Sequence, residues 1–359
     1  MVDTKIKLTE KKFSRVQRLK RKFLFWLRLT DQPVIRVYNS YGNNTHLIIH
    51  GHVLKFGPLP RKRYRKFFLT NMFAVIRSFI VVPWKNVQVL FEWGDQTYEA
   101  YSEKDGFFRF EVPPEKILSP GWYPIKIKLG KNEKQVETSG TGEIYIPYPY
   151  QHAFISDIDD TFLISHSSNL RKRLYALFTK NAKSRKPFEG VVNHYQLLAA
   201  NNAAVGTFNP FFYVSSSEWN LYELIEEFSQ TQKLPRGAFL LNQLKRFHQV
   251  LKTGQNNHKT KFMRIVRVIE AYPKQQYILL GDNSQEDPNI YLSLAEYFPQ
   301  KIFAVYLRNI SERKTEATQQ IVDQINAKGI PCCFFVHSSE AIEHSKIIGL
   351  IENTTIFPA

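Results

Sequence analysis

Cysteine is scarce in this sequence of 359 residues, which has only two, Cys332 and Cys333. They are adjacent in a run typical of a buried strand, where neighbouring side chains point to opposite faces, so we expect no disulfide between them. Because no C-x-x-C pair exists, the commonest zinc-binding arrangement is excluded as well. The cysteine content therefore predicts a protein of a reducing, cytoplasmic compartment.

Long hydrophobic runs are lacking too. The most apolar window, residues 67–83, is 17 residues long and carries Arg77 in its middle, whereas a transmembrane helix needs about 20 apolar residues. The first ten residues are charged and have no apolar stretch of the kind that a signal peptide carries. We expect a soluble protein that is at most peripheral at the inner membrane face.

Negative charge is in deficit: 32 acidic residues stand against 49 Lys and Arg, a formal charge of +17. This balance favours anionic partners, which include nucleic acid, an anionic membrane and phosphorylated substrates, and charge alone does not choose among them. Hydrophobic residues make up 43% and aromatics 14%, which is enough to build one large or two smaller cores.

Residues 1–30 form a basic arm in which ten basic residues face two acidic ones, giving 10 − 2 = +8. Its apolar residues recur at roughly helical spacing, so a basic amphipathic helix is predicted, either on an anionic membrane surface or packed on the protein's own surface. Five of the six residues 61–66 are also basic. We expect this run to be either a solvated loop or a patch that faces an anion.

From residue 31 to 150 the pattern is that of a β domain. Short strand-like runs at 34–38, 47–53, 87–91, 107–112 and 122–129 are separated by Gly-, Asn- and Asp-rich turns. Many short strands with regular turns predict an immunoglobulin-like β-sandwich, which would be an accessory domain.

Beyond residue 150 strands alternate with helices, which predicts a third part, residues 151–359. We expect an α/β domain with a doubly wound, mainly parallel sheet. The predicted strands are 154–157, 211–214, 237–241, 276–281, 302–307 and 331–336, and the helices 191–201, 219–230, 261–272, 290–298, 315–328 and 339–350.

Polar residues stand where these strands end or helices begin, the place where open α/β sheets bind ligands. Asp157 and Asp159 follow the first strand, and one of them can attack phosphorus while the other transfers the proton of the leaving group. Asp282 and Asp287 follow a later strand and can join them as oxygen ligands of Mg²⁺.

Two other motifs complete the set. Ser215 ends the second strand and can donate a hydrogen bond to a phosphoryl oxygen, with Ser216 or Ser217 capping the next helix. Lys259 stands at a helix start, where its charge could neutralise that group. Singly, each motif is more often a turn, a cap or a solvated side chain, and it is their joint order that indicates a site.

That order resembles the haloacid dehalogenase superfamily. The resemblance implies that Asp157 is the nucleophile, Asp159 the general acid and base, and Thr161 a supporting hydroxyl, with Ser215 and Lys259 holding the phosphoryl group. It also implies a Mg²⁺ site. Its metal ligands would be Asp157, Asp282, Asp287 and the backbone carbonyl of Asp159.

A narrower resemblance covers roughly residues 150 to 310. The runs 156–161, 186–191, 213–222 and 280–291 are similar to the actin-patch phosphatidate phosphatase family and its bacterial relatives, with Glu218 in place of a Pro and Asn283 in place of a Ser. This implies hydrolysis of phosphatidate to diacylglycerol and phosphate. Residues 166–189 would form a small basic cap, from which Lys183 or Arg185, together with Ser216, would bind substrate.

Two other functions stay open. The same chemistry could serve a soluble phosphomonoester, a nucleic-acid end or a phosphoprotein. Alternatively, the chain could be a non-catalytic protein that binds an anionic surface, although both acidic motifs are intact. We do not expect nucleic acid as a binding partner.

Overall fold

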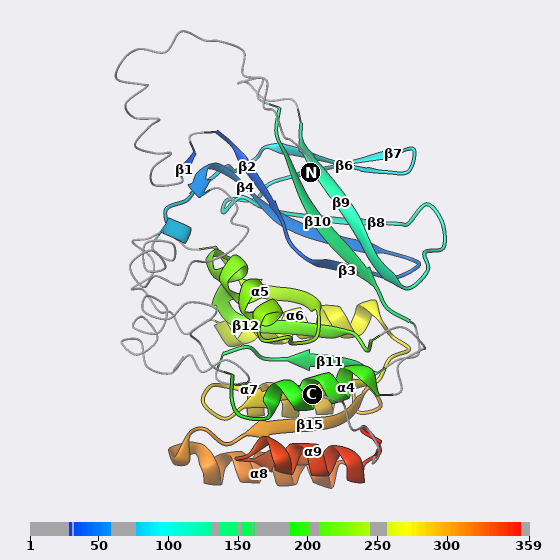
Figure 1. Cartoon of the computed structure of the whole chain (residues 1–359), viewed down its shortest axis with the longest axis vertical. Helices are drawn as coiled ribbons and strands as arrows, with labels where there is room; N and C mark the ends of the chain where they lie inside the picture. The colour runs from blue at the N-terminus through cyan, green and yellow to red at the C-terminus, as the bar shows by residue number, and fades with distance from the viewer. Residues whose placement is uncertain are drawn as a thin grey trace.

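We analysed a computed structural model of the chain, shown in Figure 1. It describes residues 29–30, 32–58, 77–130, 137–148, 152–159, 161, 187–201, 208–244 and 257–352. The basic arm, the 61–66 run and residues 162–186, which hold most of the expected cap, therefore lie outside the described residues.

A mixed, mostly antiparallel sheet region comes first. Among the described residues, neighbouring strands of this region pair antiparallel, with the exception of β3 and β10, which pair parallel. Many of its buried residues form a core around Phe91, Phe108 and Ile127, whereas others, such as Tyr38 and Tyr41, belong to the two cores of the following α/β domain. The strands are β1 (Leu29–Thr30), β2 (Val34–Val37), β3 (Ser40–Gly42), β4 (Leu47–Pro58), β5 (Val82–Pro83), β6 (Gln88–Trp93), β7 (Gln96–Tyr101), β8 (Phe107–Val112), β9 (Gly121–Leu129) and β10 (Ser139–Ile146).

A parallel six-stranded sheet with helices follows, in the order β13-β12-β11-β14-β15-β16. The first strand in sequence, β11, lies in the middle, paired with β12 on one side and β14 on the other. The elements are β11 (Ala153–Ser156), α4 (Val191–Ala200), β12 (Phe211–Glu218), η1 (Trp219–Leu221), α5 (Tyr222–Thr231), β13 (Gly237–Asn242), α6 (Asn257–Ala271), β14 (Tyr277–Asp282), α7 (Asp287–Tyr297), β15 (Ile302–Arg308), η3 (Glu312–Lys314), α8 (Thr315–Ala327), β16 (Cys332–Phe335) and α9 (Ser338–Ile347).

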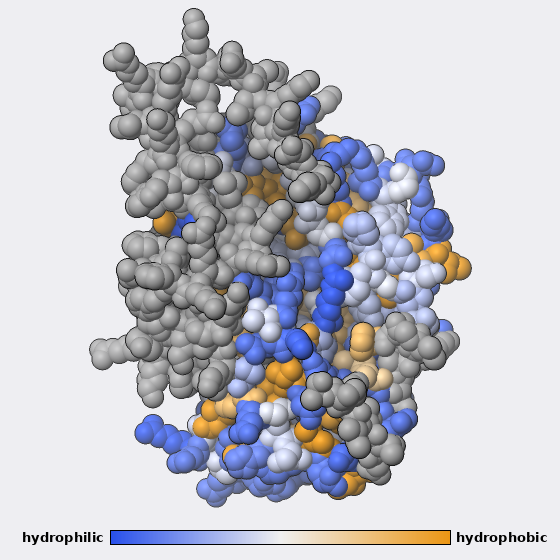
Figure 2. Space-filling model, viewed as in Figure 1, coloured by the Kyte–Doolittle hydropathy of each residue, from blue (hydrophilic) through white to orange (hydrophobic). Residues whose placement is uncertain are grey.

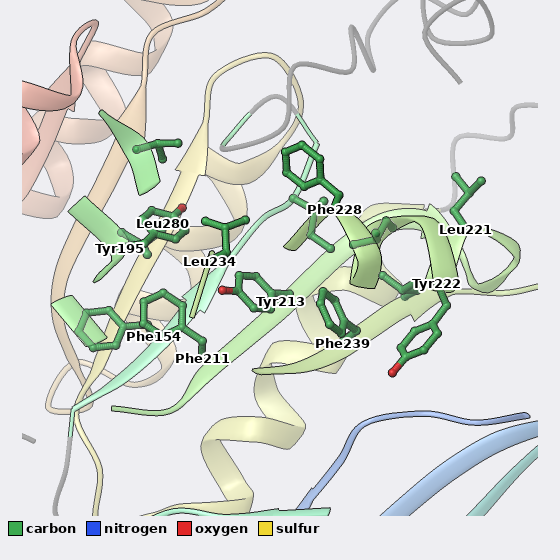
Figure 3. Packing of buried hydrophobic residues seen from close by; sticks show 14 of the residues in the cluster. Phe154, Tyr195, Phe211, Tyr213, Leu221, Tyr222, Phe228, Leu234, Phe239 and Leu280 are labelled. Carbon is green, nitrogen blue, oxygen red and sulfur yellow. The ribbon is translucent and has the colours of Figure 1, made fainter. Parts of the chain in front are cut away.

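Helices cover both faces of this parallel sheet. Along β11, Phe154 belongs to a core shared with α4, α5 and α9, whereas Ala153 and Ile155 belong to a core shared with α6, α7 and α8. This alternation follows from the two-residue period of a strand. Figure 3 shows the first core, in which Phe154 and Phe211 stack with ring centroids 4.8 Å apart.

The mixed sheet packs directly against the α/β domain. Tyr38, buried beside β2, stacks on Trp219 with centroids 4.0 Å apart and planes 12° from parallel. The backbone N–H of Asn39 donates to the Tyr222 hydroxyl at 3.1 Å, and the Tyr272 hydroxyl donates to the Gly42 carbonyl at 2.9 Å. The two regions, which lie next to each other in Figure 1, thus share buried aromatic and polar contacts.

The structure confirms the alternation of strands and helices expected after residue 150 and the series of short strands expected before it. Helix α6 begins at Asn257, one turn earlier than predicted. Among the described residues no helix is both long and apolar enough to cross a bilayer. On the face in Figure 2 hydrophilic residues predominate among the described atoms, with hydrophobic residues in smaller patches.

Candidate active site

The site is built around Asp157, the first residue after the central strand β11. Its backbone N–H donates to the Leu280 carbonyl at 2.8 Å, which continues the pairing of β11 with β14. The Ser156 hydroxyl donates to the Asp157 carbonyl at 2.6 Å and shares a hydrogen bond with the Tyr195 hydroxyl at 2.9 Å. The backbone at the strand end is therefore fixed on both sides, and the Asp157 carboxylate is 1% exposed.

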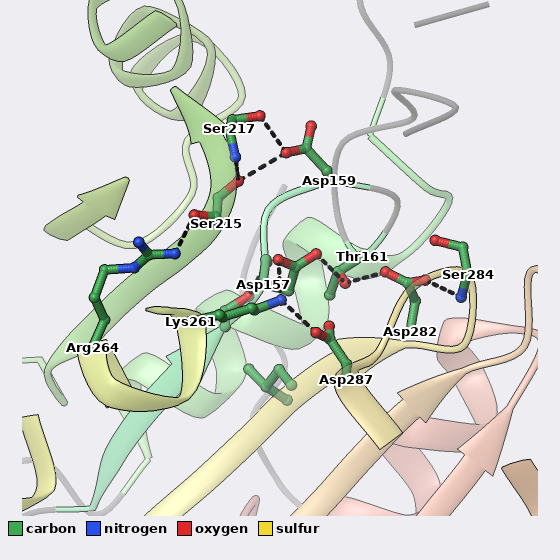
Figure 4. A network of polar contacts seen from close by, with 12 residues as sticks. Asp157, Asp159, Thr161, Ser215, Ser217, Lys261, Arg264, Asp282, Ser284 and Asp287 are labelled. Atoms are coloured by element: carbon green, nitrogen blue, oxygen red, sulfur yellow. Dashed lines mark hydrogen bonds and ion pairs between the residues drawn. The ribbon is translucent and has the colours of Figure 1, made fainter. Parts of the chain in front are cut away.

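Two further carboxylates meet Asp157 at this edge of the sheet. Asp282 ends β14 and Asp287 begins α7, and one oxygen from each of the three aspartates lies within 4.8 Å of the others. All three are buried. The Thr161 hydroxyl contacts two of them, at 3.2 Å from Asp157 Oδ2 and 3.0 Å from Asp282 Oδ2 (Figure 4).

One cation lies against this cluster among the described residues, and it is Lys261 from the second turn of α6. Its Nζ donates to Asp157 Oδ1 at 2.6 Å and also to Asp287 Oδ1. Burial alone would lower the pKa of Lys261, but the two carboxylates more than offset this and raise it. The lysine is therefore charged and holds the nucleophile candidate in place.

The cluster retains excess negative charge, because three carboxylates meet a single ammonium group. Burial, together with Asp287 and Asp282, raises the pKa of Asp157 well above its usual range despite Lys261. Burial and Asp287 raise the pKa of Asp282 to about 7. In addition, Asp287 Oδ2 has no hydrogen-bond partner among the described residues. A buried acidic cluster with a free oxygen fits a divalent cation, whose charge would lower these pKa values.

Asp159 lies beside the cluster and is held by serines of β12. Ser215 Oγ donates to Asp159 Oδ2 at 2.8 Å, and Ser217 Oγ donates to the same oxygen at 2.5 Å. Ser215 Oγ also accepts the backbone N–H of Ser217 at 2.8 Å. The two hydroxyls fix the orientation of the carboxylate at the mouth of the site, as Figure 4 shows.

The expectation that Ser216 or Ser217 caps the following helix was wrong. The N-cap residues are Glu218 for η1 and Leu221 for α5, and neither end has a side-chain cap. The strand continues to Glu218, so Ser217 points the same way as Ser215 and binds Asp159 instead. Ser216 is half-buried, and its Oγ has no hydrogen-bond partner among the described residues.

The lysine also differs from the sequence-based choice. Lys261 contacts the carboxylates, whereas the side chain of Lys259 lies outside what the structure describes, as do Lys183 and Arg185. The sequence did contain a signal: Lys261 precedes the buried Ile265 and Val268 by four and seven residues, which places it on the inward face of α6.

Arg264 was not foreseen either. Its guanidinium Nη2 donates to the backbone carbonyl of Ser215 at 3.0 Å, while its Nε has no partner among the described residues. Burial and the neighbouring Arg267 lower the pKa of Arg264 to about 10. A guanidinium is thus held next to the serine that binds Asp159.

Fold and site together define an α/β domain with an aspartate–lysine centre at the carboxyl ends of its strands. Residues 152–309 match the family "Phosphatidate phosphatase APP1, catalytic domain". Phosphatidate phosphatase APP1 of Saccharomyces cerevisiae is 28% identical over 182 residues, which are 50% of this chain and 30% of that protein. An uncharacterized protein of Schizosaccharomyces pombe is 24% identical over 159 residues, 44% of this chain and 25% of that protein.

The chain therefore spans less than a third of the length of these curated relatives. Among solved structures, a carbohydrate acetylesterase from Xanthomonas citri is 8% identical with a TM-score of 0.31, covering 85% of this chain and 68% of that one. A likeness at this level supports no conclusion about fold or function.

Proposed function

We propose that the chain is a Mg²⁺-dependent phosphomonoester hydrolase of the haloacid dehalogenase type that acts through an aspartyl-phosphate at Asp157. The observation that carries this proposal is the contact of Lys261 Nζ with Asp157 Oδ1 inside a buried cluster of three aspartates. An ammonium group against one oxygen holds the carboxylate in a single orientation, which is what attack on phosphorus requires.

In the first step an Asp157 carboxylate oxygen attacks phosphorus and the bond from phosphorus to the alcohol oxygen breaks. Asp159 gives its proton to that leaving oxygen, so the alcohol departs neutral. In the second step Asp159 takes a proton from water, whose oxygen attacks phosphorus, and the acyl-phosphate bond breaks to release phosphate and restore Asp157. The hydrogen bond of Ser217 holds Asp159 in place for both proton transfers.

Asp157, Asp282 and Asp287, with the backbone carbonyl of Asp159, would hold Mg²⁺. When bound, the ion offsets the negative charge on the phosphoryl oxygens and on the carboxylates. Lys261 supplies a fixed positive charge at the same centre. Phosphoryl binding by the Ser215 hydroxyl and Lys259 remains part of the proposal, as does substrate binding by Ser216, Lys183 or Arg185.

Phosphatidate is the substrate that the family match favours, and the formal charge of +17 suits an anionic lipid surface. We further propose a three-part organisation: a basic amphipathic arm at 1–30, an immunoglobulin-like accessory domain at 31–150 and the phosphatase domain at 151–359. A cytoplasmic protein that docks at the inner membrane face is consistent with this arrangement. A soluble phosphomonoester is the second candidate, because the described centre recognises only the phosphoryl group.

The test is phosphate release from short-chain phosphatidate in mixed micelles, with and without Mg²⁺. Asp157→Asn should abolish release, whereas Asp323→Asn, at an exposed position of α8, should not change it. Turnover of an aryl phosphate without turnover of phosphatidate would support Asp157 as the nucleophile and exclude phosphatidate as the substrate. If wild type released phosphate from neither substrate, the chain would be better described as a non-catalytic binding protein.

A further inference from the structure

A pocket of about 480 Å³ lies between the mixed sheet and the α/β domain. One wall comes from β4 and β8, and the other from the end of β13 and one face of α6. Its volume falls within the range of small-molecule sites. None of the steps proposed above uses this pocket.

The pocket is next to the catalytic centre through two elements. Arg264, which lines it, donates to the carbonyl of Ser215, and the hydroxyl of Ser215 donates to Asp159. Arg264 also lies three residues, less than one helical turn, beyond Lys261 on α6. Figure 4 shows Arg264 in contact with Ser215, and Ser215 and Ser217 in contact with Asp159. The pocket is therefore connected with the acid and base candidate, Asp159, through Arg264 and Ser215.

The lining combines apolar surface with unpaired positive charge. Ile48, Phe107, Trp219, Leu241 and Met263 supply the apolar surface. Arg109, Arg264 and Arg267 supply three positive charges against Glu103 and Asp105. Arg109 is paired with Glu111 at 2.9 Å, whereas the structure records no carboxylate partner for Arg264 among its described residues, and the Nε of Arg264 has no acceptor there. A largely buried guanidinium whose Nη2 donates to the Ser215 carbonyl but whose Nε lacks an acceptor among the described residues favours a ligand that carries oxygen acceptors.

We propose that this pocket receives the alcohol portion of the substrate, with Arg264 donating to oxygens close to the ester bond. This inference rests on the proposed function, because Asp159 must give its proton to the leaving oxygen and the alcohol must then extend from the Asp159 side of the centre. An alcohol with an apolar body and hydrogen-bond-accepting oxygens near the phosphoester fits the lining. An acylglycerol has this chemistry, whereas a small polar alcohol would leave the apolar wall uncovered.

The test is calorimetric titration of dihexanoyl phosphatidate into the Asp157→Asn protein, which binds without hydrolysing. In that background Met263→Trp fills the pocket from an exposed position, and Glu270→Trp is a matched control two turns further along the same face of α6, outside the lining. We expect Met263→Trp to weaken phosphatidate binding at least tenfold and to leave phenyl phosphate binding unchanged. Glu270→Trp should change neither.

Arg264 is tested by Arg264→Gln, with Arg264→Lys as the variant that keeps the charge. We expect the first to weaken phosphatidate binding at least tenfold and the second to recover part of the loss. Equal affinity for phosphatidate in the Met263→Trp and Glu270→Trp proteins, or no binding of phosphatidate at all, would overturn the inference. Hydrolysis of an aryl phosphate by the protein with Asp157 intact is a separate readout, so failure of the proposed chemistry is distinguishable from failure of the pocket.

Discussion

Replacing Lys261 with Met removes one charge from a fully buried centre at nearly constant side-chain volume. Its Nζ contacts Asp157 and Asp287, and the lysine side chain is 2% exposed. Breaking a buried ion pair by removing one partner typically costs about 3 to 5 kcal/mol. Here the carboxylates left behind can take up a proton, since burial already raises the pKa of Asp157 and Asp282. We therefore expect a loss of about 3 kcal/mol, the lower end of that range.

The assay is urea unfolding followed by circular dichroism at pH 8, with divalent cations chelated so that no metal replaces the lost charge. Lys328→Met is the matched control, because it breaks an ion pair with Glu296 of 3.3 Å in which both side chains are more than a third exposed. Exposed pairs contribute at most about 1 kcal/mol. The two substitutions thus differ mainly in the burial of the ion pair that each of them breaks.

A double-mutant cycle separates the ion pair from the loss of packing. If the charge matters, Asp287→Asn should restore part of the stability in the Lys261→Met protein, because one unpaired carboxylate is removed. Equal losses for Lys261→Met and Lys328→Met, or no recovery with Asp287→Asn, would refute the account of the centre as an acidic cluster neutralised by one lysine.

Three other outcomes are expected. Saturating Mg²⁺ at about 100 times its dissociation constant should raise the unfolding free energy of wild type by about 2.7 kcal/mol, and Asp282→Asn should reduce this gain in the same titration. Burial, with Arg36 nearby, lowers the pKa of His52 to about 3, so only the unfolded state gains a proton as the pH falls below 6.5. The free energy of unfolding of wild type should therefore fall as the pH is lowered from 6 to 4.5. In the His52→Gln protein the slope of this free energy against pH should be smaller by about 1.4 kcal/mol per pH unit. Tyr38→Ala should cost about 3 kcal/mol in urea unfolding, because it removes the ring stacked on Trp219; a loss below 1 kcal/mol would show that this contact does not couple the two regions.

The architecture after residue 150 was predictable because each parallel strand is buried on both faces and so reads as a continuous apolar run. Residues Tyr277–Asp282 of β14 are buried throughout, and the chain then turns to polar residues at Asn283 and Ser284. The same rule places Asp157 and Ser215 where the apolar runs of two neighbouring strands end. The sequence thus indicated which edge of the sheet holds the site.

The contacts inside the site were less predictable, because they depend on where elements begin and end. Helix α6 starts one turn earlier than its apolar pattern indicated, and the lysine that contacts the carboxylates is Lys261, in the second turn of the helix. Strand β12 continues past Val214 with a shift in its pairing to β13. This extension turns Ser217, rather than Ser216, toward Asp159. The pairing irregularity has no local sequence signal.

The mixed sheet has a direct connection to the catalytic centre. Trp219 follows the serine-bearing strand immediately, and its indole stacks on Tyr38 from the mixed sheet. The next residue, Asn220, donates through Nδ2 to the Ser78 carbonyl at 2.9 Å, and Tyr222 accepts the Asn39 N–H. The end of β12, and with it the hydroxyls that orient Asp159, is therefore fixed from outside the α/β domain. Without the mixed sheet, Trp219 and Tyr222 would be exposed and these hydroxyls would lose their support, so we infer that the catalytic geometry requires both regions.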